Sequence, residues 1–174
     1  EKRGDVLFTS SLCVETVLAV IFMLIGLLAA DPITALVGAN AEVYDMTRTY
    51  LQVILLFSPM FMINNLLGAM IRNDGNTSLA MTAMLSGCLF NIVFDYIFVF
   101  PMGLGLFGAV LATAVAPIIS ILILLQHFVK KKNQFRLIRV RPDVRLVASA
   151  AGLGVPSLVT EVSSGLVIAV FNLL

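Results

Sequence analysis

Five long apolar segments divide the 174-residue chain and restrict it to one kind of fold. A helix needs about 20 apolar residues to cross the roughly 30 Å hydrocarbon core of a bilayer. The segments are continuous, whereas the strands of a membrane barrel alternate over about ten residues. We therefore predict an all-α, polytopic membrane bundle. Its spans are expected at residues 6–30, 49–71, 77–100 and 104–128, with a fifth that begins near 146.

The composition agrees with a membrane protein. Hydrophobic residues make up 60% of the chain and charged residues 12%, against about 25% charged residues in soluble domains. Gly, Pro, Asn and Asp gather in the short breaks between segments, as they do in turns. The chain begins without Met and stops inside an apolar run, so we expect an internal piece of a longer protein of the plasma (inner) membrane.

The positive charges indicate how the spans are oriented. Seven of the eleven Lys and Arg residues lie in the break after the fourth segment, namely Lys130, Lys131, Lys132, Arg136, Arg139, Arg141 and Arg145. Breaks that fall on the opposite side are acidic or uncharged. Because basic loops remain in the cytoplasm, we predict that residues 130–145 form a cytoplasmic loop. Few aromatic residues interleave with these charges, so we do not expect nucleic acid to bind.

Asp95 lies inside the third segment, where a carboxylate is costly and normally faces a bundle interior or a water-filled cavity. Asn91 precedes it by four residues, and positions i and i+4 share one helical face. The pair offers carboxylate and amide oxygens to one place, which suits Na⁺ or H⁺. The other polar residues noted inside apolar segments are Glu15, Gln52, Asn64, Asn65, Thr113, Ser120, Glu161, Ser163 and Ser164.

Three prolines and two further carboxyls complete the candidates inside the spans. Pro59, Pro117 and Pro156 are hinge candidates, because proline removes a helical hydrogen bond and bends a helix; ordinary kinked packing is at least as common. Glu161 could serve proton coupling, or it could be a neutral Glu bonded to another helix. For Glu15, interfacial snorkelling or a bond to another helix is the favoured interpretation.

The remaining reactive residues do not suggest an enzyme. Cys13 and Cys88 both fall in predicted spans, where small thiols in helix packing are a better explanation than a disulfide or a metal site. His127 lies near a helix end without a partner motif, and we expect it at the membrane interface. An intramembrane enzyme would need paired catalytic groups. We therefore predict no catalysis and no cofactor.

Three stretches, taken in order, form a pattern over essentially the whole chain. They are Arg72-Asn73-Asp74-Gly75-Asn76-Thr77, then Asn91-x-x-x-Asp95 followed by Gly105-x-x-Gly108-Ala109-x-x-Ala112-Thr113, and finally Gly154-Val155-Pro156-Ser157. Their order, spacing and fit to the span boundaries resemble the multidrug and toxic compound extrusion (MATE) transporters.

The resemblance implies twelve helices in two six-helix lobes related as parallel repeats. Residues 1–129 would supply the third to sixth helices of the first lobe. The loop at 130–145 would join the lobes, and 146–174 would be the truncated first helix of the second lobe. The remaining helices would lie outside this chain.

The resemblance also implies site residues. A cation site would use Asp95, Asn91 and Thr113, together with an acidic residue on the missing first helix. Glu161 would take part in substrate binding or proton coupling. Beyond Na⁺ at Asp95, no metal is expected.

The implied activity is antiport, in which inward Na⁺ or H⁺ movement drives the export of organic, often cationic, drugs and toxic compounds. Two alternatives stay open. Flippases for lipid-linked oligosaccharides have a similar helix plan, but they usually carry cationic residues in a central cavity, and no Lys or Arg lies in mid-span here. The chain by itself could also be an inactive structural fragment, because five spans cannot build two lobes.

Overall fold

The computed structural model of the chain describes residues 2–36 and 41–130, together with 148, 159–160, 162–164 and 167. The first two ranges fold into helices and turns, and they contain no strand. The predicted all-α fold is therefore confirmed for this part of the chain. The helices are α1 (Lys2–Leu28), α2 (Ala30–Leu36), α3 (Tyr44–Leu56), α4 (Ser58–Asn73), α5 (Thr77–Val99) and α6 (Gly105–Val129).

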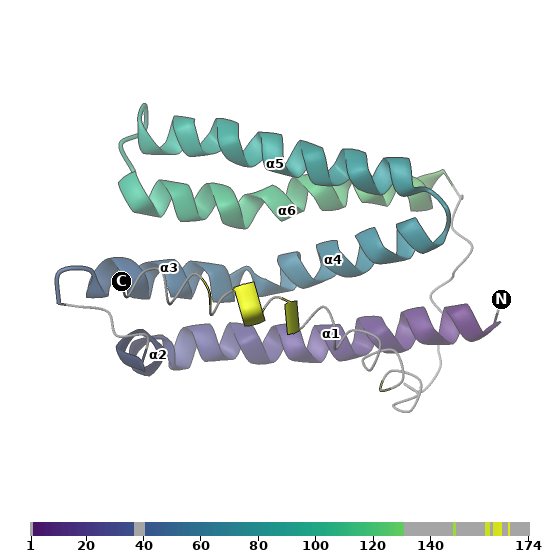
Figure 1. The fold of residues 1–174 in the computed structure, drawn as a ribbon, viewed down its shortest axis with the longest axis horizontal. Coiled ribbons are helices and arrows are strands. Elements are labelled where there is room, and N and C mark those ends of the chain that lie inside the picture. The colour runs from purple at the N-terminus through teal and green to yellow at the C-terminus, as the bar shows by residue number, and fades with distance from the viewer. Residues whose placement is uncertain are drawn as a thin grey trace.

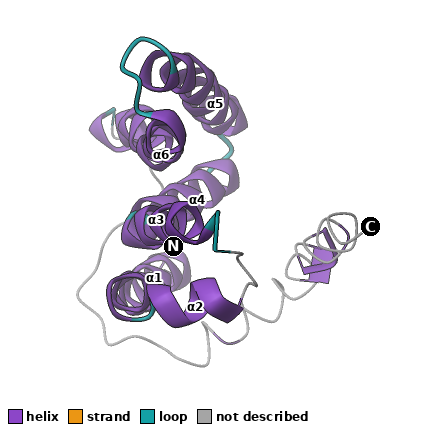
Figure 2. Cartoon of the chain, turned by 90° about the vertical axis from the view of Figure 1, so that its left-hand side faces the viewer, coloured by secondary structure: helices purple, strands orange, loops and turns teal. Residues whose placement is uncertain are grey.

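The helices stack in successive layers, which the two views show from perpendicular directions (Figures 1 and 2). α1 and α2 form one outer layer, α3 and α4 lie next, and α5 and α6 lie beyond them, with α4 in contact with both. α5 and α6 make the most extensive contact, while α6 also touches both α3 and α4. The start of α1, the α4–α5 turn and the end of α6 gather at one end of the bundle (Figure 1). The helices thus run in alternating directions, as successive membrane spans do.

Four of the five predicted spans fall on helices of the described ranges. α1, α5 and α6 are each long and apolar enough to cross a membrane, and α3 with α4 meets the same test as a pair bent by 47°. The fifth predicted span falls almost entirely outside the described residues. The sequence did not predict α2, which begins where Asp31 and Pro32 indicated a break. The Asp31 carboxylate pairs with Arg48 on α3, and the Tyr44 hydroxyl donates to the Asp31 carbonyl oxygen, so α2 contacts the start of α3.

The second span is divided into two helices beside one of the hinge candidates. α3 ends at Leu56, and α4 begins at Ser58 with Pro59 in its first turn. Proline is well tolerated there, because its missing N–H would have had no partner in the helix. α6, in contrast, continues without a break through Pro117, which is buried. Pro156 lies outside the described residues.

The three residues of the turn between α4 and α5 have different structural roles. Asp74 is the C-cap of α4, and Gly75 has a φ of 83°, a backbone conformation that residues with a side chain seldom adopt. Asn76 is the N-cap of α5, where its Oδ1 accepts a hydrogen bond from the Leu79 N–H at 3.3 Å. Such a cap satisfies a backbone donor that the first turn of a helix leaves unpaired.

Small residues bring α5 and α6 together along their length. Gly87 on α5 is buried, and a Cβ added there would lie 3.4 Å from the Ala116 carbonyl oxygen of α6. Gly108 in the first turns of α6 is tighter still, since an added Cβ would lie 2.9 Å from the backbone carbonyl carbon of Phe98. This close approach is typical of membrane helices, whose backbones meet where side chains are small. It holds the polar residues of α5 against those of α6.

Candidate functional site

Asn91 on α5 and Thr113 on α6 meet across the contact between these two helices. The Asn91 Nδ2 donates a hydrogen bond to Thr113 Oγ1 at 3.2 Å, and the Thr113 hydroxyl donates in turn to the Ala109 carbonyl oxygen at 3.1 Å. Both side chains are half-buried. Because the amide nitrogen is engaged by Thr113, the Asn91 Oδ1 is the atom of this amide that can accept a proton donor or coordinate a cation.

Asp95 lies one helical turn beyond Asn91. Its Oδ1 is buried and has no hydrogen-bond partner among the described residues. Neither Asn91 nor Thr113 is hydrogen-bonded to it. A buried carboxylate oxygen without a donor is unfavourable by at least 1–3 kcal/mol, on the order of a lost hydrogen bond to a buried group. A bound proton or a small cation would supply the missing interaction.

A cavity of about 450 Å³ opens between α4, α5 and α6, beside the Asn91–Thr113 pair. That volume lies within the range of about 300–1,000 Å³ that is usual for small-molecule sites. Its polar lining comes from all three helices. The lining residues are Phe61, Asn64, Met84, Gly87, Cys88, Asn91, Ile92, Thr113, Ala116, Pro117 and Ser120. A mostly apolar wall with a few polar groups is the usual form of a site for an amphipathic ligand.

Asn64 combines a place in the cavity lining with an unsatisfied side-chain oxygen. It lies on α4, lines the cavity, and its Oδ1 is buried without a hydrogen-bond partner in the part of the chain that the structure describes. Asp95 does not belong to the lining, although it follows Asn91 on the same helix. Two oxygen atoms that lack donors, one amide and one carboxylate, therefore lie on the helices that enclose the cavity.

The sequence placed Asn64 among the polar residues of the spans but did not connect it with Asp95. The two residues lie on different helices, and α4 carries apolar residues on most of its surface, so composition does not reveal which face meets α5 and α6. The usable signal was the presence of an amide inside an apolar segment.

Among the remaining carboxyl and sulfur candidates in the described ranges, Cys88 lines this cavity, whereas Glu15 and Cys13 do not. The Glu15 Oε2 on α1 is buried without a partner among the described residues. Cys13 and Cys88 are free thiols, and both are exposed. Within residues 2–36 and 41–130, no group of three or more His, Cys, Asp or Glu side chains could hold a metal ion. Glu161 lies outside the described residues.

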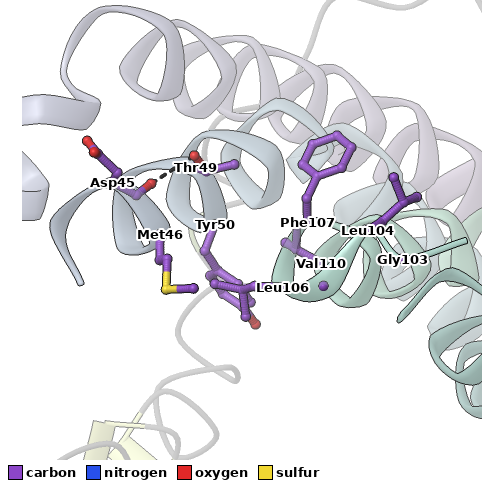
Figure 3. Close-up of a pocket in the computed structure, with 10 residues that line it drawn as sticks. Asp45, Met46, Thr49, Tyr50, Gly103, Leu104, Leu106, Phe107 and Val110 are labelled. Carbon is purple, nitrogen blue, oxygen red and sulfur yellow. Dashed lines mark hydrogen bonds between the residues drawn. The ribbon is translucent and has the colours of Figure 1, made fainter. Parts of the chain in front are cut away.

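A second hollow of about 390 Å³ lies at the opposite end of the bundle from the α4–α5 turn, between the start of α3 and the start of α6. Figure 3 shows the Tyr50, Leu106 and Phe107 side chains there, together with the bond from the Thr49 hydroxyl to the Asp45 backbone carbonyl. The Asp45 carboxylate points away from the aromatic side chains (Figure 3). This hollow is therefore an apolar surface without a charged group directed into it.

His127 differs from its sequence-based expectation. We expected it near a helix end without a partner motif, and it does lie in the last turn of α6, but its side chain is only 2% exposed and has partners that the sequence did not indicate. The His127 Nε2 lies 3.0 Å from Asp74 Oδ2, and its Nδ1 lies 3.2 Å from Asn76 Nδ2. Its partners come from the α4–α5 turn, which is distant in sequence.

Three membrane-length helices, one bent span and a cavity between α4, α5 and α6 are the features of a polytopic membrane protein. The MatE family model matches residues 1–97, which is more than half of the chain. The chain belongs to this family.

Relatives of known name support the assignment. The chain is 29% identical over 159 residues to the multidrug export protein MepA of Staphylococcus saprophyticus, covering 90% of this chain and 35% of that protein. It is 27% identical over 158 residues to MepA of Staphylococcus aureus (strain NCTC 8325), with the same two shares. The chain therefore spans about a third of the length of these relatives.

Solved structures share the fold. The inward-facing form of a multidrug resistance MATE family transporter of the MOP superfamily matches with a TM-score of 0.79 at 27% identity, covering 86% of this chain and 35% of that one. A MOP superfamily transporter from Pyrococcus furiosus, described as having a binding pocket of reverse polarity, matches with a TM-score of 0.82 at 27% identity, covering 94% of this chain and 37% of that one.

Proposed function

We propose that the full-length protein is an antiporter that exports organic, often cationic, compounds across the plasma membrane in exchange for Na⁺ or H⁺. Family membership and the likeness to multidrug export proteins support the transport of drugs. The observation that carries the coupling mechanism is the buried Asp95 Oδ1, which has no partner among the described residues and lies on α5, one of the three helices that line the cavity.

The ion would bind at Asp95. In the sodium form, the Asp95 carboxylate and the Asn91 Oδ1 would be the oxygen ligands on α5, and the Thr113 hydroxyl oxygen, which accepts from Asn91 Nδ2 in this structure, would be the ligand on α6. In the proton form, Asp95 becomes neutral, which removes the cost of its unpartnered buried charge. The acidic residue that the family resemblance implies on the first helix would complete the site.

Coupling requires that the ion and the drug favour different conformations of the lobe, since a ligand shifts an equilibrium only by its difference in affinity for the two states. The bend beside Pro59 divides the second span near the level of the cavity wall, because Phe61 and Asn64 follow it in the next turns of α4. We propose this bend as a hinge, with Pro117 as the second candidate on α6.

The same proposal includes the arrangement of the lobes and their orientation in the membrane. Residues 1–129 form part of the first lobe, the basic segment 130–145 is the cytoplasmic loop between lobes, and 146–174 opens the second lobe with Glu161 as a coupling residue. The end of the bundle that holds the α4–α5 turn and the end of α6 then faces the cytoplasm (Figure 1). The remaining helices of the full-length transporter and the lipid bilayer are the partners of this part.

The substrate would occupy the cavity between α4, α5 and α6. Phe61 and Met84 offer aromatic and thioether surface, and flexible methionine side chains adapt to ligands of different shape. Asn64 and Asn91 supply amide groups that fix the orientation of a bound molecule. No Lys or Arg occurs in the lining, so the described residues give no specific support to a flippase for anionic lipid-linked sugars.

Cys88 offers a direct test of this cavity, because it is exposed and lines the cavity while Cys13 is exposed on α1. In full-length protein that keeps Cys88 as its one cysteine, ethidium should slow labelling by N-ethylmaleimide. The slowing should follow the ethidium concentration, and mass spectrometry would measure it. The matched control keeps Cys13 alone and should be labelled at the same rate with and without ethidium. Equal protection of both cysteines, or of neither, would argue against this cavity as the substrate site.

The transport proposal is tested with the full-length protein reconstituted into liposomes. Ethidium movement is followed by fluorescence under an imposed Na⁺ gradient and, separately, under an imposed H⁺ gradient. We expect one of the gradients to drive ethidium against its own gradient. If neither gradient moves ethidium or a second organic cation while a lipid-linked sugar is transferred between leaflets, the flippase alternative replaces the antiporter.

A further inference from the structure

The largely buried cluster of Asp74, Asn76 and His127 joins three helix ends at the end of the bundle that we assign to the cytoplasm. Asp74 closes α4, Asn76 opens α5, and His127 lies in the last turn of α6. The His127 and Asp74 side chains are 2% and 7% exposed. At 1.5 Å per residue, Asn76 lies about 28 Å along α5 from Asp95, so this cluster is separate from the proposed ion site.

The hydrogen bonds of Asn76 fix the protonation pattern of His127. The Asn76 Oδ1 accepts from the Leu79 N–H at 3.3 Å, so the amide nitrogen is the atom that faces His127 Nδ1 at 3.2 Å. An NH₂ group only donates, which requires His127 Nδ1 to accept and to carry no proton. His127 Nε2 then carries the proton and donates it to Asp74 Oδ2 at 3.0 Å. The described arrangement is therefore that of a neutral histidine.

A second proton on His127 would strengthen its contact with Asp74 and make its contact with Asn76 unfavourable. The charged imidazole would bond more strongly to the Asp74 carboxylate. It would also place an N–H on Nδ1 directly against the Asn76 NH₂, so that two donors face each other. Asn76 could turn its oxygen toward His127 only by withdrawing it from the Leu79 N–H, and the cap of α5 would then be lost.

The other charged side chains at this end are few among the described residues. Asp5 lies in the first turn of α1, which approaches the end of α6 where Phe8 stacks with Phe128 at 6.5 Å between ring centroids. Arg72 lies in the last turn of α4 and Lys130 directly follows α6, and both are exposed. Asp74 is the carboxylate that pairs with the imidazole.

We propose that Asp74, Asn76 and His127 form a proton-sensing switch, in which protonation of His127 releases the Asn76 cap of α5. Histidine is the side chain whose charge most often changes between about pH 5 and 8, so the switch responds to cytoplasmic acidification. When the cap is released, the first turn of α5 becomes less ordered, and α5 is the helix that carries Asn91 and Asp95. The switch regulates the lobe and is independent of which ion or drug the transporter uses.

The test is hydrogen–deuterium exchange of the full-length protein in lipid nanodiscs, read on peptides that cover residues 76–82. Rates at about pH 8 and about pH 5.5 are corrected for the intrinsic pH dependence of exchange. We expect acidification to reduce protection of this segment about fivefold, the factor that corresponds to an N-cap of about 1 kcal/mol at 1.4 kcal/mol per tenfold. No transport is required for this readout.

Two variants separate the switch from an ordinary buried hydrogen bond. His127→Gln cannot take up a proton in this range, and Asn76→Ser keeps a good N-cap while shortening the side chain that reaches His127. Both should show protection that does not change between the two pH values, and the second remains informative if the first does not fold. The proposal is overturned if wild-type protection is independent of pH, or if either folded variant keeps the wild-type pH response.

Discussion

Replacing Asp95 by Asn should leave the protein folded. The increase in the rate of drug export that a given ion gradient causes should fall by about 10- to 100-fold. The factor corresponds to losing a charge-assisted ligand, which contributes about 1.5–3 kcal/mol. Asn is close to Asp in size, so the packing of α5 is preserved, and the loss of the unpartnered buried charge favours folding. Ethidium efflux from liposomes, measured against the size of the ion gradient, gives the result.

Asp45→Asn is the matched control for this variant. Asp45 is an exposed carboxylate in the first turn of α3, and its side chain points away from the neighbouring hollow (Figure 3). Its replacement should leave the ion dependence within about twofold of the wild type, because an exposed group away from a site changes a free energy by about 0.5 kcal/mol or less. If Asp95→Asn behaves like Asp45→Asn, then Asp95 has no part in coupling.

Adding one methyl group at Gly108 should destabilise the protein by about 1–3 kcal/mol, the usual cost of overpacking. The added Cβ would lie 2.9 Å from both the carbonyl carbon and the Cβ of Phe98, and 3.0 Å from the Leu104 Cβ. A backbone carbon cannot move aside as a flexible side chain would, so α6 must shift away from α5. The thermal unfolding midpoint of full-length Gly108→Ala in detergent should therefore fall by several degrees.

Gly4→Ala is the comparison for this substitution. Gly4 also lies in a helix, but an added Cβ there meets nothing within 4 Å. Because alanine is the better helix former, this change should be neutral or stabilising by about 0.5–1 kcal/mol. A midpoint for Gly108→Ala that equals or exceeds that of Gly4→Ala would show that the α5–α6 contact is looser than described.

The membrane spans could be predicted because length and apolar content are local properties of a segment. Positions of α1, α5 and α6 follow from them to within a few residues. α2 could not be predicted in this way, because Asp31 and Pro32 indicate a break. Its place depends on contacts with other helices, in which Ala30 and Thr34 become buried and Asp31 pairs with Arg48, 17 residues away in sequence. The position of Pro59 marked the bend of the second span, but its angle depends on packing.

In the candidate site, too, only the features that depend on local sequence could be predicted. Helical spacing placed Asn91 and Asp95 on one face, while Thr113 entered only through the family resemblance. Asn64 lines the same cavity as Asn91 and Thr113 because of the rotation of α4 about its axis, which packing against α5 and α6 determines. The partners of His127 could not be predicted either, because Asn76 and Asp74 are 51 and 53 residues away in sequence.

Ion release on drug binding tests the proposed exchange most directly. Ethidium is added to purified full-length protein in weakly buffered solution, binding is followed by its fluorescence, and released ions are measured with a pH dye and a Na⁺-selective electrode. We predict that binding displaces H⁺ or Na⁺ in proportion to the ethidium bound, and that Asp95→Asn binds ethidium without releasing either ion. Binding to the wild-type protein without ion release, or equal release from Asp95→Asn, would contradict the account.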